Sequence, residues 1–107
     1  TYIKVKLMKF GSYQNLSNAL SLISDLGMKP VLGNGVAGEI GCWMEALAAK
    51  THITNAGEMN GFMKPVSSIL KNPLQFNNGC ISLEPSYLPN IDLNLINQFQ
   101  ISSKQYY

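Results

Sequence analysis

Charged side chains are scarce in this chain of 107 residues: they make up 13% of it, against roughly 25% in typical soluble domains. The formal net charge is only +2, which gives no electrostatic basis for binding nucleic acid or an anionic membrane. A small free-standing domain normally covers its surface with charge. The scarcity of charge therefore indicates that part of the surface is buried against another part of a larger fold. The alternative is a small domain that tends to associate because its surface carries little charge.

Long apolar runs, an export signal and a cysteine framework are also missing. No run approaches the length of a membrane span, and no charged segment followed by an apolar one opens the chain. Cys42 and Cys80 fit neither a disulfide scaffold nor a metal spacing, and Cys42 is expected to be a small buried hydrophobe. These absences favour a reducing, cytoplasmic setting. Because a strand pattern starts at Thr1, we expect an upstream portion of the protein.

The first two-thirds of the chain alternates strand and helix patterns. Alternation of apolar and polar residues indicates strands, and Leu, Ala and Ile at helical spacing indicate helices. Ser12 or Asn15 can cap the first helix, and Gly27 supplies its end. The expected elements are a strand at 2–9, a helix at 12–26, a strand at 28–34, a helix at 38–50 and a strand at 53–60.

This β-α-β-α-β order, with short connections, predicts an α/β fold in which helices cover a parallel sheet. After Pro65 the pattern changes to turns, with one short strand at 80–83 and a short helix at 92–99. Residues 1–99 are therefore expected to form one unit, and residues 100–107 a loose tail.

The first strand carries lysines on one face. Its apolar residues at odd positions should face the helices, so Lys4 and Lys6 point to the other face. In a closed barrel that face is the interior, and the residue nearest the carboxyl end points into the active site. A partly desolvated Lys6 could serve there as a base, and Glu58 has small neighbours suited to such an interior. The alternative is an edge strand with solvated lysines.

Gly33, Gly35 and Gly38 spell G-x-G-x-x-G, and Glu58 follows twenty residues after the last of them. This spacing is the dinucleotide-binding fingerprint. In that fold, however, the glycines follow the first strand, whereas here a complete strand–helix unit precedes them. In the alternative interpretation, the first two glycines allow a sharp turn, and Gly38 and Gly41 allow close helix packing. A nucleotide-binding half-fold around Gly33–Gly38 stays as the less favoured hypothesis.

The segment IKVKLMKFGSYQNLSNALSLISDLGMKPVLGN resembles the sixth strand, sixth helix and seventh strand of the enolase superfamily barrel. It is most similar to the mandelate racemase/muconate-lactonising enzyme group. Lys6, Lys9 and Gly11 match the K-x-x-K-x-G pattern of that group, and AGEMNGFMK matches its eighth-strand E-x-x-G pattern at Glu58. The resemblance implies that residues 1–99 are the C-terminal portion of a TIM-type (β/α)7β barrel, with 100–107 as a tail.

The resemblance also implies a reaction: abstraction of a proton α to a carboxylate, giving an enolate held by a divalent metal, usually Mg²⁺. Such enzymes are racemases or epimerases, cycloisomerases and dehydratases, that is, isomerases and lyases. By position, Lys6 is the general acid/base, Glu58 contacts the substrate carboxylate or its enolate, and Lys9 is supportive. Lys9, together with Asn34 and Gly35 at the seventh-strand rim, is expected to bind a small-molecule carboxylate substrate, with Asn34 as a polar contact.

The chain departs from the family pattern at several places. Relatives with a His–Asp pair place the histidine near Gly35, whereas His52, the only histidine, lies at the wrong end of a strand and is expected to be a surface or helix-capping residue. The metal ligands of the family would precede Thr1, and Asp25 and Asp92 are no substitute. The chain alone should therefore hold no metal and be inactive.

Two classes of function consequently stay open. In the first, the chain is part of an enolase-superfamily enzyme whose remaining barrel strands, with their Mg²⁺ ligands, lie upstream, and which forms a possible homo-oligomer. In the second, it is a non-catalytic fragment or an interaction module that docks on a partner supplying the missing strands.

Overall fold

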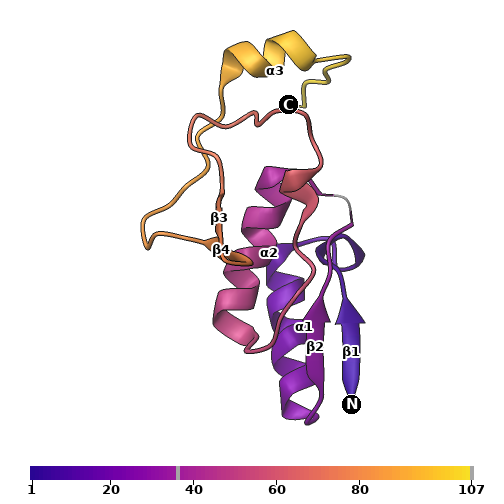
Figure 1. Ribbon diagram of the computed structural model, residues 1–107. Helices are drawn as coiled ribbons and strands as arrows, with labels where there is room; N and C mark the ends of the chain where they lie inside the picture. Colours follow the sequence, from indigo (N-terminus) through magenta and orange to yellow (C-terminus); the bar gives the residue numbers. More distant parts are fainter. Residues whose placement is uncertain (36, 107) are drawn as a thin grey trace.

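The computed structural model describes residues 1–35 and 37–106, and its N-terminal part contains a two-stranded parallel sheet at one side of the molecule (Figure 1). Strand β1 (Tyr2–Val5) pairs with β2 (Lys29–Leu32), with Tyr2 opposite Lys29 and Val5 opposite Leu32. The parallel pairing predicted for these two segments is confirmed. The first strand is shorter than predicted, because Leu7 already begins a 3₁₀ turn, η1 (Leu7–Lys9).

Helices α1 (Tyr13–Asp25) and α2 (Glu39–His52) pack against each other and against one side of this sheet (Figure 1). Ser12 starts α1, since its Oγ accepts a hydrogen bond from the Asn15 backbone N–H at 3.1 Å. Gly27 follows the end of α1 with a φ of +71°, the left-handed conformation that favours glycine. Both helices match their predicted ranges within two residues.

The core joins these four elements. Leu16, Leu20 and Leu32 are completely buried and pack with the other members of the cluster. Of the apolar face predicted for the first strand, Val5 is buried, whereas Ile3 lies at the exposed edge of β1. The cluster consists of Val5, Leu16, Leu20, Ile23, Leu32 and Ala48.

The predicted third strand at 53–60 is reduced to a single parallel bridge between Gly33 and Glu58. The Glu58 N–H donates to the Leu32 carbonyl at 2.8 Å, which continues the sheet for one residue. Pro30 explains why the pairing extends no further, because it has no N–H to donate. Its carbonyl instead accepts a hydrogen bond from the Asn55 side-chain amide at 2.9 Å.

The last third of the chain lies at the periphery. A 3₁₀ turn, η2 (Gly61–Met63), leads to an antiparallel hairpin of β3 (Gln75–Asn77) and β4 (Cys80–Ser82) and then to α3 (Leu93–Phe99). The short strand and final helix predicted from sequence are confirmed; β3 was not predicted. Residues 100–106 are exposed, as expected of a tail, and residue 107 lies outside the described residues.

Two parallel strands and one further bridge, covered by two helices, would occur in a (β/α)7β barrel and in other parallel α/β folds alike. The barrel and the unit at 1–99 therefore stay predictions. Within residues 1–35 and 37–106, no helix combines the length and the apolar character needed to cross a bilayer.

Candidate functional site

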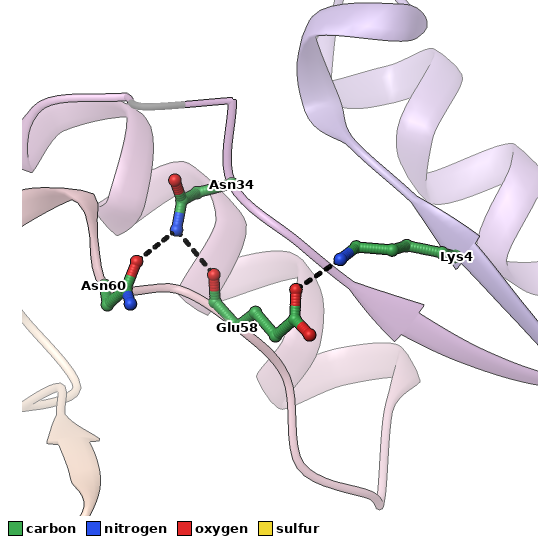
Figure 2. Close-up of polar contacts among 4 residues, drawn as sticks. All are labelled: Lys4, Asn34, Glu58 and Asn60. Atoms are coloured by element: carbon green, nitrogen blue, oxygen red, sulfur yellow. Dashed lines mark hydrogen bonds and ion pairs between the residues drawn. The ribbon is translucent and has the colours of Figure 1, made fainter.

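An ion pair links β1 to the segment around Glu58, and β2 lies between these two segments. Lys4 on β1 extends its side chain over the carboxyl end of β2, and its Nζ donates to Oε2 of Glu58 at 2.5 Å (Figure 2). The two residues are 54 positions apart in sequence, so this contact exists only because β2 lies between them. Carboxyl ends of parallel strands are where functional side chains gather in α/β folds.

Gly33 provides the space for this ion pair. A Cβ atom at that position would lie 2.9 Å from Cε of Lys4 and 3.5 Å from Oε2 of Glu58. The chain bends at Gly35, as the sharp-turn interpretation expects, although neither Gly33 nor Gly35 has a positive φ. Gly35 also lies under Met8, whose Sδ would be 2.0 Å from an added Cβ. Both glycines therefore serve close packing at the rim.

The carboxyl group of Glu58 is ionised at neutral pH. The hydrogen bond from Lys4 is the main cause that holds its pKa below the usual value, followed by the charge of Lys4 and, more weakly, that of Lys6. The carboxylate is exposed, so water also solvates it. The resemblance implies that Glu58 is either protonated or hydrogen-bonded. In the structure its carboxylate accepts a hydrogen bond from Lys4.

Lys6 and Lys9 line a groove beside the ion pair. Lys6 follows β1 in an extended conformation, with φ −142° and ψ 135°, so the strand alternation places it on the same face as Lys4. Lys6 is half-buried, whereas Lys9 at the end of η1 is exposed. Both side chains and Lys4 border a groove of about 460 Å³. The charge of Lys6 thus acts on the carboxyl group of Glu58, but Lys4, and not Lys6, contacts Glu58 directly.

Asn34 holds the segment around Glu58 in place through hydrogen bonds. Its side-chain amide donates to the Glu58 backbone carbonyl at 2.6 Å and to Oδ1 of Asn60 at 2.7 Å (Figure 2). Its backbone N–H also donates to the Glu58 carbonyl, at 3.2 Å. Asn34 is therefore a positioning residue for the loop that carries Glu58. The sequence analysis did not single out Asn60, although Asn60 stands two residues after Glu58 and so shares its side of an extended segment.

The start of α2, where a pyrophosphate would lie in a dinucleotide-binding fold, is covered by the segment 61–74. Glu39 in its first turn is buried and accepts hydrogen bonds from the Leu74 N–H at 3.2 Å and from the Ser68 hydroxyl. Gly61 lies so close that an added Cβ would be 1.9 Å from the Ala37 carbonyl oxygen. Residue 36 within the fingerprint lies outside the described residues. This covered helix end does not favour the nucleotide hypothesis.

The remaining titratable residues lie apart from the ion pair. His52 ends α2 and contacts α1, with its Nε2 2.6 Å from Oγ of Ser17. Asp25 ends α1, and Asp92 caps α3 by accepting from the Asn94 N–H at 2.9 Å. Among residues 1–35 and 37–106, no three His, Cys, Asp or Glu side chains are grouped to hold a metal ion, so these residues do not fit a Mg²⁺ site.

The two cysteines are free thiols. Cys42 is buried in α2, as predicted, and this burial raises the pKa of its thiol. Cys80 is exposed on β4.

No protein-family model matches this chain, and neither a comparison with curated proteins nor one with solved structures found a similar protein. The enolase-superfamily interpretation therefore depends only on the resemblance of the sequence, including the motifs around Lys6 and Glu58.

Proposed function

We propose that this chain is the part of an enolase-superfamily enzyme that carries the proton-transfer lysine and its carboxylate partner. The observation that supports this proposal is the convergence of Lys4, Lys6 and Glu58 at the carboxyl ends of three parallel segments. The reaction would be abstraction of a proton α to a carboxylate, followed by racemisation, cycloisomerisation or dehydration. The substrate is a small-molecule carboxylate.

In this proposal, the side-chain nitrogen of Lys6 accepts the α-proton. The electron pair of the broken C–H bond forms the C=C bond of the enolate, and its negative charge moves to the carboxylate oxygens. The resemblance implies that Glu58 contacts the enolate, but an ionised carboxylate would repel it. In this proposal the ammonium of Lys4 therefore stabilises that charge, and Glu58 holds Lys4 in place through their ion pair. Return of the proton from Lys6 to the same face regenerates the starting enantiomer, so racemisation would need a second acid, outside this chain, that protonates the opposite face.

The proposal places other components outside this chain. Mg²⁺ and its ligands would come from other barrel strands, and no step above depends on them. The two free cysteines are compatible with a reducing, cytoplasmic setting. Lys9 borders the groove beside the ion pair, and Asn34 holds the Glu58 loop in place, with Gly35 next to Asn34 in the chain.

Exchange of the substrate α-proton in D₂O tests this function. The full-length gene product containing this chain is incubated with Mg²⁺ and a panel of 2-hydroxy and 2-amino carboxylates, and ¹H NMR follows loss of the α-proton signal. We expect Lys6→Ala to lower the exchange rate by about 10²-fold or more, because it removes the base. Lys71→Ala, in a loop at the periphery, is the matched control and should exchange at the wild-type rate. Equal rates for wild type and Lys6→Ala would overturn the role of Lys6.

A second candidate function, an interaction module, has its own support. Several large apolar side chains are more than half exposed, which is costly for a free-standing domain. Size-exclusion chromatography with hydrogen exchange on the isolated chain distinguishes the two cases, since a compact, protected monomer would argue against a docking module. These side chains include Tyr2, Met8, Leu22, Leu26, Met63 and Leu88.

A further inference from the structure

The outer edge of β1 has no neighbouring strand within residues 1–35 and 37–106. The backbone carbonyls of Thr1 and Val5 accept hydrogen bonds from the N–H groups of Lys29 and Gly33. The backbone N–H and C=O groups of the odd-numbered residues of β1 therefore point toward β2. In a parallel pair, the backbone groups of alternate residues point to opposite sides. The N–H and C=O groups of Tyr2 and Lys4 therefore point outward along this edge.

A positively charged groove follows the same edge. It has a volume of about 460 Å³, and Ile3, Val5 and Phe10 give it apolar walls. Its three lysines are Lys4, Lys6 and Lys9, of which only Lys4 has an ion-pair partner within the described part of the chain. The groove thus combines an unpaired strand edge, apolar surface and uncompensated positive charge.

We propose that the outer edge of β1 accepts an extended acidic segment of a partner polypeptide as an additional strand. The backbone of that segment would pair with Tyr2 and Lys4, and its carboxylates would reach Lys6 and Lys9. Charge complementarity selects an acidic strand over a neutral one. A small anion is the weaker candidate, because it would leave the outward backbone groups without partners. This interface rests on the second candidate function, the interaction module, because in a complete barrel the preceding strand would occupy this edge.

Binding of synthetic peptides to the 107-residue chain tests the interface. The probe is a fluorescently labelled eight-residue peptide that alternates Glu and Val, and fluorescence anisotropy gives its dissociation constant. We expect a peptide with Lys in place of Glu to bind at least about tenfold more weakly. N-methylation of the backbone along one edge of the peptide should abolish binding, whereas N-methylation along the other edge should not, since only one edge pairs with β1.

Substitutions in the chain provide the second part of this binding test. Lys9→Glu should weaken the acidic peptide at least about tenfold and strengthen the Lys-containing one, whereas Lys71→Glu, outside the groove, should change neither. Equal loss from N-methylation on both edges, or full displacement of the peptide by millimolar succinate, would overturn strand addition and leave a small-anion site. No binding of the acidic peptide would also overturn the proposal.

Discussion

Two glutamates show how their surroundings determine what the same side chain can do. Glu58 is exposed and ion-paired with Lys4, so it stays ionised and available at the rim. Glu45 on α2 is only 1% exposed, and its Oε2 has no hydrogen-bond partner. Burial raises the pKa of Glu45 to about 7. The first glutamate suits a functional site, while the second makes the stability of the fold depend on pH.

Glu45→Gln should remove much of this pH dependence. Because the folded pKa of Glu45, about 7, lies above its usual 4.5, the folded state binds this proton more tightly than the unfolded state. Its contribution to stability is complete below about pH 4.5 and is lost as the pH rises through 7, on the order of 3 kcal/mol in all. Urea unfolding at pH 5 and pH 8 measures the effect.

The exposed Glu84→Gln is the matched control and should keep the wild-type pH dependence. An identical fall in the free energy of unfolding between pH 5 and pH 8 for wild type and Glu45→Gln would contradict the assignment to Glu45.

At the scale of the element, local signals in the sequence predicted well. The Ser12 cap, the Gly27 end and the apolar spacing between them predict α1 because they act within one helix. The third strand was overpredicted, since its pairing depends on Pro30 in another segment. The contact between Lys4 and Glu58 likewise depends on the register of three segments over a glycine, which residue spacing does not show. The rim position of Lys6, in contrast, follows from strand alternation alone.

The packing of η2 against the start of α2 predicts a large effect of Gly61→Ala. The added Cβ would be 1.9 Å from the Ala37 carbonyl oxygen, a backbone atom that moves only with its whole segment. We expect a loss of roughly 1–3 kcal/mol in the free energy of unfolding, measured by urea denaturation.

Gly35→Ala is the matched comparison for Gly61→Ala. Its new methyl group meets only the Met8 side chain, which is 64% exposed and can move aside, so the loss should stay below about 1 kcal/mol. Equal losses for the two variants would contradict the described contact at Gly61.

The whole molecule consists of a packed α/β unit with a loosely attached C-terminal part. Its radius of gyration is 15.0 Å, larger than the roughly 13 Å of a compact domain of this length. The buried cluster lies within residues 5–48, whereas α3 buries no residue and lies away from the sheet in Figure 1. Leu70 and Leu74 are also buried, so stability should depend on residues up to 74 and least on α3.

Deletion of residues 93–107 should lower the free energy of unfolding by less than about 1 kcal/mol, because little apolar surface is lost from the core. Leu20→Ala, which opens a cavity at a completely buried position, should cost roughly 2–5 kcal/mol. Thermal and urea unfolding followed by circular dichroism provide both values. A deletion as costly as Leu20→Ala would show that α3 belongs to the core.

Titration of the Glu58 carboxyl group by ¹³C NMR tests most directly whether the parallel strands bring both lysines to this residue. We predict a pKa below the usual glutamate value in the wild type. It should rise markedly in Lys4→Met and slightly in Lys6→Met, and stay unchanged in Lys71→Met. A wild-type pKa at the usual value, with no response to either Lys4→Met or Lys6→Met, would contradict the site.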